Sequence, residues 1–323
     1  MAPARQVALP QAVGETDPSF APDVIAGLTG RPKRIPAKYF YDARGAQLFE
    51  AITRTPEYYL TRCELSILRE RGREIAALLP EGSALIELGS GSSEKARILL
   101  SAAPGIRLYA PVDISREMLS EEAERLQRDY PGLCVIPVQA DFAEPFVLPA
   151  PVLRVTRSGF FPGSTVGNFE PPAAVEFFRR LGRTLGHRAA LIVGVDLIKS
   201  AQVLDAAYND AAGFTREFNL NLLSRMNREL NAEFDLASFE HRAFFNSGRD
   251  RVEMHLASRK AQRIRVAGRV IDFKKDETIH TENSYKYSIA SFADLARRAG
   301  WEPASSWADA GSMFSVHALR NAA

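Results

Sequence analysis

The segment 85–95, with the sequence LIELGSGSSEK, constrains the fold of this chain more than any other. A short apolar run contains the acid Glu87, glycines follow at positions 89 and 91, and a helical pattern begins at Ser92 or Ser93, either of which can cap a helix. Glycine permits a positive φ and a close approach of a ligand to the backbone, and the first turn of a helix presents unpaired N–H groups. The segment therefore predicts a strand, a ligand-binding turn and a helix.

The residue at position 94 narrows the choice of ligand. A full dinucleotide-binding fingerprint has a third glycine there, whereas this chain has Glu94, whose carboxylate would repel a pyrophosphate. A nucleoside without phosphates tolerates an acid, and S-adenosylmethionine (SAM), which carries a positive sulfonium, is such a ligand. On the glycines alone, a strand-turn-helix corner without a ligand remains the alternative.

Acids also follow the next two expected strands. The strand 108–113 ends at Asp113, 22 residues beyond Gly91, near the offset of about 20 residues at which an acid reaches the ribose hydroxyls in this class of fold. Asp141 and Phe142 follow the strand 134–140 and suit an adenine, because an acid accepts from the exocyclic amine and a ring lines the wall. Capping of the helix 115–130 is the alternative role of Asp113.

Strands and helices alternate between residues 65 and 196, which predicts a doubly wound parallel α/β sheet. A helix is expected over 65–79 and a strand over 189–195, whereas the strand expected over 156–161 is unusually polar in its first half. The glycine-bracketed loop 162–171 delivers Asn168 beside the predicted methyl donor. Capping of the helix 173–185 is the alternative role of Asn168, although prolines at 171 and 172 already suit a helix start.

The alternation stops between about 202 and 286, where helical segments precede stretches of alternating polarity, and this indicates an inserted α+β domain. The prolines of residues 1–22 predict a flexible N-terminal arm, with order beginning near Val24. The expected domains are residues 63–198 with 287–323, which bind the nucleoside, and residues 23–62 with 199–286, which bind the substrate.

Composition excludes several classes of protein. The 41 basic and 39 acidic residues give a net charge of +2, which favours neither nucleic acid nor an anionic membrane as a partner. The two cysteines, Cys63 and Cys134, are too few for a disulfide scaffold, and the absence of a CxxC motif or a Cys/His cluster argues against zinc. We therefore expect no bound metal. We also expect a cytoplasmic protein, because neither a secretory leader nor an apolar run of membrane-spanning length is found.

Several motifs, in this order, resemble those of the histidine Nα-methyltransferases of ergothioneine biosynthesis. They are YFYD at 39–42, PEYY at 56–59, ELGSGSSEK at 87–95, PGSTVGN at 162–168 and ENS at 282–284. The resemblance spans roughly residues 24–320 and implies a SAM-dependent enzyme that trimethylates the α-amino group of L-histidine to give hercynine. It also implies a Rossmann-like class I methyltransferase sheet with a second, inserted α+β substrate-binding domain. The polar strand with Arg157 departs from the family's pattern, which leaves the local sheet geometry open but not the chemistry.

The resemblance also implies roles for individual residues. The residues implied to bind SAM are Gly89, Ser90, Gly91, Lys95, Asp113, Asp141 and Phe142. The residues implied to bind histidine are Asn168 and Tyr208 for the carboxylate, Tyr58, Glu282 and Ser284 for the imidazole, and Met254, with Tyr41 and Gly163 near the reacting amine.

Three alternatives remain open from the sequence. The tyrosine-rich stretch between 39 and 59, taken alone, is more typical of a packed subdomain edge than of an aromatic lid. A relative that methylates another α-amine, such as a tryptophan derivative, is the closer functional alternative, although an indole has one donor where Glu282 and Ser284 offer two partners. A non-catalytic nucleoside-binding module is the more distant one. A monomer is expected.

Overall fold

The computed structural model describes residues 17–322. The described chain forms two compact units: unit 1 comprises residues 60–198 and 285–322, and unit 2 comprises residues 17–59 and 199–284. The boundary falls before Leu60 because helix α3 (Leu60–Ala76) is continuous from that residue. The ligand-binding roles expected for the two domains stay predictions at this point.

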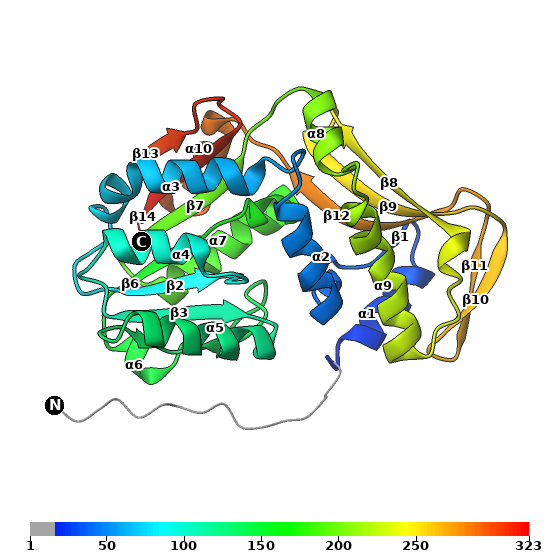
Figure 1. The fold of residues 1–323 in the computed structure, drawn as a ribbon, viewed down its shortest axis with the longest axis horizontal. Helices are drawn as coiled ribbons and strands as arrows, with labels where there is room; N and C mark the ends of the chain where they lie inside the picture. Colours follow the sequence, from blue (N-terminus) through cyan, green and yellow to red (C-terminus); the bar gives the residue numbers. More distant parts are fainter. Residues whose placement is uncertain (1–16, 323) are drawn as a thin grey trace. The chain divides into compact units, whose positions relative to one another are not determined.

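Unit 1 is built on an eight-stranded sheet (Figure 1). Its strands are β2 (Ala84–Leu88), β3 (Leu108–Asp113), β4 (Cys134–Val135), β5 (Val138–Gln139), β6 (Arg157–Phe161), β7 (Ala190–Asp196), β13 (Trp301–Ala308) and β14 (Phe314–Asn321). The order is β13-β14-β7-β6-β2-β3-β4, with β5 also paired to β3. Strands β2 to β7 pair in parallel and β14 is antiparallel to both neighbours. This order confirms the Rossmann-like class I methyltransferase sheet.

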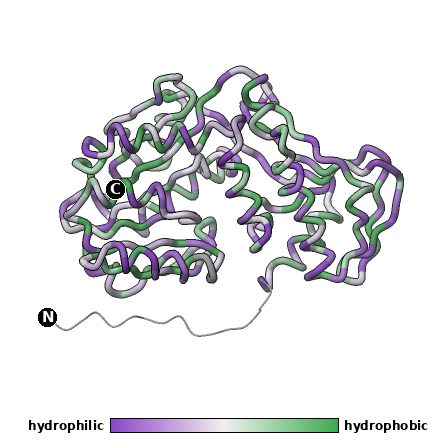
Figure 2. Tube along the Cα trace, in the orientation of Figure 1, coloured by the Kyte–Doolittle hydropathy of each residue, from purple (hydrophilic) through white to green (hydrophobic). Residues whose placement is uncertain are grey.

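Helices cover both faces of this sheet. Strands β2 and β7 are buried at every position, as expected for parallel strands with helices on each side. The remaining helices of unit 1 are α4 (Glu94–Ala102), α5 (Arg116–Asp129), α6 (Ala150–Leu153), the 3-10 turn η2 (Thr165–Asn168), α7 (Pro171–Leu185) and α10 (Ile289–Arg298). Helix α3 packs against α4, and α7 packs against α10. Figure 2 shows mainly hydrophobic colouring along the central strands, whereas α5 alternates between hydrophilic and hydrophobic residues.

The third predicted strand, 134–140, is not continuous. It is divided into β4 and β5 around Ile136 and Pro137. Proline lacks the N–H that a ladder needs, so the pairing with β3 lapses there and resumes at Val138. Pro111, by contrast, lies inside β3, where its residue partner on β2 is Glu87.

The polar strand near Arg157 is nevertheless a central strand of the sheet. β6 pairs with both β2 and β7. Its buried Ser158 is satisfied by a hydroxyl–hydroxyl hydrogen bond of 3.1 Å to Ser83. The guanidinium of Arg157 donates to the carbonyls of Leu185, at 2.9 Å, and Leu153, at 3.1 Å. The polar groups are therefore paired at the start of the strand, which leaves the sheet geometry intact.

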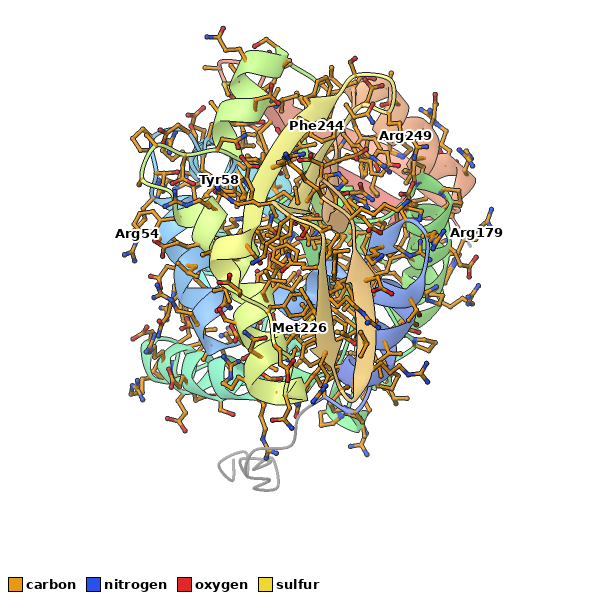
Figure 3. All side chains as sticks on the ribbon, turned by 90° about the vertical axis from the view of Figure 1, so that its right-hand side faces the viewer. Arg54, Tyr58, Arg179, Met226, Phe244 and Arg249 are labelled. Atoms are coloured by element: carbon orange, nitrogen blue, oxygen red, sulfur yellow. The ribbon has the colours of Figure 1, made fainter. Side chains whose placement is uncertain are left out.

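Unit 2 is an α+β unit with a four-stranded sheet of order β1-β12-β9-β8 and a β10-β11 hairpin. Its strands are β1 (Lys33–Arg34), β8 (Phe239–Asn246), β9 (Arg251–Ser258), β10 (Gln262–Val266), β11 (Arg269–Phe273) and β12 (Thr278–Tyr285, which ends at the first residue of unit 1). Its helices and 3-10 turns are α1 (Phe20–Thr29), η1 (Ala37–Phe40), α2 (Ala43–Thr53), α8 (Ala201–Ala207), α9 (Phe214–Leu230) and η3 (Leu236–Ser238). Helix α9 packs on α2, β8 and β9. In Figure 3 Met226 of α9 lies among packed side chains, while Arg54 points outward.

The expectation of a flexible arm over residues 1–22 is wrong at its end. Helix α1 already begins at Phe20, whose ring is fully buried. Pro22 stands in the first turn of this helix, where a missing N–H costs no intrahelical hydrogen bond. The arm as far as residue 16 lies outside the described residues.

Within residues 17–322, every helix is too short or too polar to cross a membrane.

Candidate functional site

The glycine turn after β2 has the conformation that its sequence predicts. Gly89 and Gly91 have φ values of +71° and +37°, which favour glycine. A Cβ at Gly89 would also lie 3.4 Å from the ring of Phe142, whereas a Cβ at Gly91 would meet nothing within 4 Å. The backbone at Gly91 is therefore open to a ligand.

The helix after the turn is not capped as expected. Ser93 occupies the N-cap position of α4, but its hydroxyl makes no capping hydrogen bond. It donates instead to the carboxylate of Glu122 on α5 and accepts from Arg97 at 2.9 Å. The first N–H groups of α4 consequently receive no side-chain cap from Ser93.

Asp113 faces the glycine turn from the end of β3. Its Oδ1 accepts from the N–H of Ser115 at 3.0 Å, and its Oδ2 accepts from the N–H of Gly91 at 3.5 Å. Burial raises the pKa of this carboxyl, opposed by these backbone hydrogen bonds. Asp113 remains half-buried. Asp113 thus stabilises the turn before α5, and part of its side chain stays exposed beside Gly91.

Asp141 and Phe142 lie at the adjacent strand end. Asp141 Oδ1 accepts from the N–H of Ala143 at 2.9 Å, which orients the carboxylate. The Phe142 ring packs edge-on against Phe161, with centroids 5.7 Å apart. The same ring lies beside Gly89, where a Cβ would be 3.4 Å from it. The structure therefore brings the ring predicted to line an adenine to the glycine turn.

Lys95 and Gly163 meet at a carboxylate that the sequence interpretation did not include. Lys95 Nζ lies 2.6 Å from Oε2 of Glu64, and the N–H of Gly163 donates to both carboxylate oxygens, at 2.9 and 3.1 Å. Glu64 is fully buried on α3. A signal was present, because Glu64 shares a helix face with Leu60 and Leu68, where an acid is unusual.

Asn168 and Ser90 keep their polar groups available. Asn168 ends η2 and is half-buried, and its side-chain amide makes no hydrogen bond to the described residues. Glu170, not Asn168, occupies the N-cap position of α7, and prolines stand at the helix start. Ser90 is buried next to Gly89. The geometry thus argues against the capping role of Asn168.

In unit 2, Tyr41 and Tyr58 belong to an aromatic cluster. Tyr41 packs edge-on against Phe49 at 5.7 Å and against Phe218 at 5.8 Å, and Phe49 packs against Tyr58 at 6.1 Å. Phe218 of α9 was not predicted, since it is remote in sequence from Tyr41, which it contacts. Packing accounts for much of the tyrosine-rich stretch, yet Tyr41 remains half-buried.

The backbone carbonyls of Tyr208 and Met254 both lie within hydrogen-bonding distance of polar side chains of unit 2. Tyr208 follows α8, and its carbonyl lies 3.0 Å from Nε2 of His241. Met254 is buried in β9, and its carbonyl accepts from the hydroxyl of Thr281 at 3.0 Å. The same hydroxyl donates to Asn219 at 2.9 Å, so α9 is joined to β9 and β12.

Glu282 and Ser284 lie on β12, as predicted for an extended segment. Their two-residue spacing directs both side chains to one face. Glu282 is half-buried and Ser284 is buried. The ring of His280, two residues earlier, lies with its Nε2 3.0 Å from the carbonyl of Glu282, which braces the strand at that residue.

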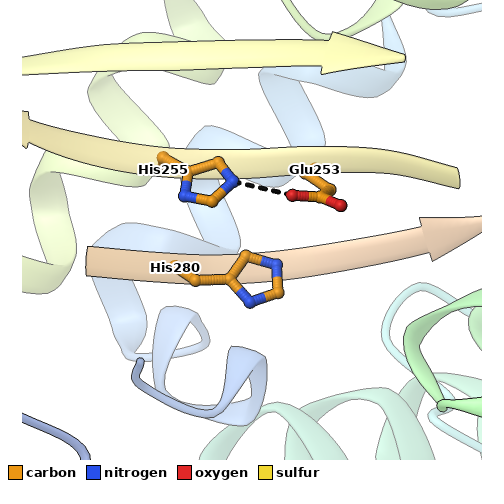
Figure 4. Close-up of side chains that lie close together, drawn as sticks. All are labelled: Glu253, His255 and His280. Carbon is orange, nitrogen blue, oxygen red and sulfur yellow. Dashed lines mark hydrogen bonds and ion pairs between the residues drawn. The ribbon is translucent and has the colours of Figure 1, made fainter. Parts of the chain in front are cut away.

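Glu253, His255 and His280 form a compact polar cluster on β9 and β12 (Figure 4). Their donor atoms lie within 4.8 Å of one another, a spacing that a metal ion can bridge. Arg251, however, holds Glu253 at 2.8 Å. Burial raises the pKa of Glu253, but hydrogen bonds from His255, Arg251 and Asn246 lower it to about 2. Because a guanidinium already balances this carboxylate, we interpret the cluster as a polar network rather than a metal centre.

The structure thus groups the predicted residues by unit. Unit 1 brings the nucleoside-binding candidates to one edge of its sheet, together with Gly163 and Asn168. Unit 2 holds the aromatic candidates around α9 and the polar candidates on β12.

Comparison with known proteins adds independent findings. The model of the SAM-dependent, histidine-specific methyltransferases matches residues 20–321. The chain is 42% identical over 299 residues to the histidine N-alpha-methyltransferase of Mycolicibacterium smegmatis, covering 91% of this chain and 92% of the relative. It is 38% identical over 303 residues to the enzyme of the same name from Mycobacterium tuberculosis, with the same coverage. It is also 30% identical to ergothioneine biosynthesis protein 1 of Neurospora crassa, covering 89% of this chain and 33% of the relative.

The acid of the ELGSG segment, Glu87, lies fully buried beneath the turn. Burial raises its pKa to about 8, although a hydrogen bond from the Tyr109 hydroxyl and the charge of Lys95 act in the opposite direction. Glu87 therefore retains a proton at neutral pH.

The raised pKa of Glu87 predicts that the stability of the folded chain depends on pH. Between the ordinary glutamate pKa of about 4.3 and the folded value, the native chain holds a proton that the unfolded chain has released, so stability falls as pH rises. The Glu87→Gln variant cannot ionise at this position. As pH rises from 5 to 8, its free energy of unfolding should therefore increase relative to that of the parent, by at most about 1.4 kcal/mol per pH unit. Urea denaturation at several pH values measures this difference. Glu94→Gln, at an exposed acid of the same segment, is the control, and parallel profiles for Glu87→Gln and the parent would contradict the assignment.

Proposed function

Because the chain belongs to the SAM-dependent, histidine-specific methyltransferases, we propose that it transfers methyl groups from SAM to the α-amino nitrogen of L-histidine. The observation that carries this proposal is the match of the family model to nearly the whole described chain. The product of three transfers is the trimethylated betaine hercynine. We further propose that the protein acts as a cytoplasmic monomer without a metal.

The residues at the edge of the unit 1 sheet fit SAM. The open backbone at Gly91 and the uncapped first turn of α4 suit the close approach of a ligand. In the proposal, Asp113 accepts from the ribose hydroxyls, Asp141 accepts from the adenine amine, and Phe142 lines the adenine. Gly89, Ser90 and Lys95 complete the donor-binding set.

The proposal assigns histidine to a second set of residues. Asn168 and Tyr208 hold the carboxylate, since an amide N–H and a phenolic hydroxyl are neutral donors. Glu282 and Ser284 bind the two imidazole nitrogens, and Tyr58 and Met254 contact the ring. The free amide of Asn168 and the shared strand face of Glu282 and Ser284 support these roles.

Methyl transfer to an amine requires orientation more than acid–base power. The SAM sulfonium supplies the methyl group, and the reaction is an in-line displacement that is accelerated when the two reactants are held in line and water is excluded. The amine has to be neutral to attack. The Tyr41 hydroxyl and a carbonyl near Gly163 are neutral acceptors that steer its lone pair, and water carries the proton away. An aromatic wall tolerates the growing quaternary ammonium through a weak cation–π attraction of about 0.5–2 kcal/mol.

A mass-spectrometric assay tests the function directly. The purified protein is incubated with SAM and each of the twenty amino acids. We expect methylated product only with histidine, with trimethylhistidine accumulating at long times. Turnover of tryptophan in preference to histidine would indicate the alternative amine substrate, and SAM binding without any product would indicate a non-catalytic module.

Asp113 and Asp141 should dominate nucleoside recognition. Removing either carboxylate leaves a buried ligand donor unpaired, at a cost of about 1–3 kcal/mol in SAM binding. Calorimetry of Asp113→Ala and Asp141→Ala measures this loss. Glu144→Ala, at an exposed acid that follows Asp141 closely, is the matched control. Parent-like SAM affinity in both variants would remove these residues from the site.

Glu282 should decide the preference for histidine. A polar group in a desolvated site disfavours any ligand that cannot form a hydrogen bond with it. Selectivity for histidine therefore depends on the pairing of Glu282 with a ring N–H. Glu282→Gln and Glu282→Ala should raise the KM for histidine far more than the KM for SAM, and should narrow the ratio of histidine to leucine turnover. Thr278→Ala, at the start of the same strand, is the control. Unchanged relative rates across the amino acids would exclude Glu282 from the substrate site.

A further inference from the structure

Glu64 is a buried carboxylate that joins two candidate site residues. It lies on α3 with an exposed fraction of 0%, and its Oε2 is 2.6 Å from Nζ of Lys95. Both of its oxygens accept from the N–H of Gly163, at 2.9 and 3.1 Å. Residues 64, 95 and 163 are remote in sequence, so the carboxylate fixes one helix terminus and one loop at the same point.

The sheet is shaped to admit this side chain. A Cβ at Gly194, in the middle of β7, would lie 2.0 Å from Oε1 of Glu64. The neighbouring loop also requires glycine, because Gly163 has a φ of +78°. Gly194 therefore makes room for the Glu64 carboxylate, and the glycine at position 163 permits the backbone conformation in which the loop N–H reaches it.

The pairing leaves Lys95 with capacity for a ligand. An ammonium has three N–H donors, and the ion pair with Glu64 uses one of them. The Lys95 side chain is 17% exposed, so its head is only partly removed from solvent. A lysine held by a buried acid has a defined position, because the ionised carboxylate cannot be left without its partner in a dry environment.

The loop that carries Gly163 has a second, separate anchor. The N–H of Asp196 donates to the hydroxyl of Ser164 at 2.9 Å, and the Asp196 carboxylate pairs with Lys286 at 2.8 Å, both side chains being fully buried. Loss of Glu64 would therefore release the Gly163 side of the loop while Ser164 stays attached.

We propose that Glu64 is a positioning residue for methyl transfer, which holds the Lys95 ammonium for the donor and the Gly163 backbone for the reacting amine in one arrangement. The inference rests on the proposed function for the roles of Lys95 and Gly163. Glu64 itself acts through these two groups and does not touch the reactants.

Two substitutions separate the two contacts. Glu64→Gln keeps an oxygen for the Gly163 N–H but removes the charge that holds Lys95, so SAM affinity should fall about 10- to 100-fold while kcat falls less. Glu64→Ala removes both contacts, so kcat at saturating SAM and histidine should fall by a further factor of about 10 or more. SAM affinity is measured by calorimetry without histidine, and kcat by the mass-spectrometric assay.

A double-mutant cycle tests whether Glu64 acts through Lys95. Lys95→Met should weaken SAM binding to a similar degree, and Glu64→Gln combined with Lys95→Met should be no weaker than the worse single variant, because both remove the same interaction. Additive losses would overturn the coupling.

The control for a merely structural role is Asn321→Ala. Asn321 is a buried polar residue of the same unit, and its amide donates to the carbonyls of Gly182 and Gly186 at 2.9 and 2.8 Å. This variant should lose thermal stability and keep the parent's SAM affinity and kcat. If the Glu64 variants behave like Asn321→Ala, or do not fold, Glu64 is structural and the proposal is wrong.

The calorimetric measurements also separate this inference from the proposed function. If the parent binds SAM but does not methylate histidine, the function fails, while the effect of Glu64→Gln on SAM affinity still decides whether Glu64 positions Lys95. If the parent methylates histidine and Glu64→Gln binds SAM as the parent does, only the inference fails.

Discussion

The parallel pairing of the strands in unit 1 is the constraint on which the candidate site depends. β2 pairs with β3 and β6, and β6 pairs with β7, so all of these strands end at one edge of the sheet. The backbone turns away there, and its N–H groups are no longer taken up by the ladder. The glycine turn, Asp113, Phe142 and the loop at Gly163 all follow strand ends at this edge. Residues separated by 99 positions are thereby placed in contact, as the hydrogen bond from Gly163 to Glu64 shows.

The same edge concentrates buried charge, and each charge has a partner. Glu64 pairs with Lys95, and Asp196 pairs with Lys286. Buried pairs of this kind contribute little net stability, since desolvation offsets the attraction, but removal of one partner is costly. Their effect is therefore to fix positions. A carboxylate that accepts two hydrogen bonds from Gly163 and one from Lys95 leaves neither group free to relax when a ligand arrives, which is the arrangement that catalysis by orientation requires.

The sequence predicted what local patterns encode. The strand, the glycine turn and α4 follow from hydrophobic periodicity and from the restricted φ of ordinary residues, and they were found as expected. Errors arose where one residue overrode the pattern: Pro137 divides the third strand, and the hydroxyl of Ser93 is drawn to Glu122 and not to the helix backbone. Glu64 and Phe218 were missed for another reason. Their contacts join distant parts of the chain, and no spacing within one helix shows which residues will lie opposite it.

The charge state of this edge suits the reaction that the family performs. When a methyl group passes from a sulfonium to a neutral amine, a positive charge that is localised on sulfur becomes shared between sulfur and nitrogen. A bare anion beside the sulfur would stabilise the reactant more than the transition state and would slow the transfer, because only stabilisation that is stronger in the transition state accelerates a reaction. The acids around the glycine turn avoid that outcome in different ways. Glu64 is balanced by Lys95, and Glu87, with a pKa of about 8, carries a proton at neutral pH. Buried acids can therefore shape the donor-binding edge without holding the positive charge on the donor.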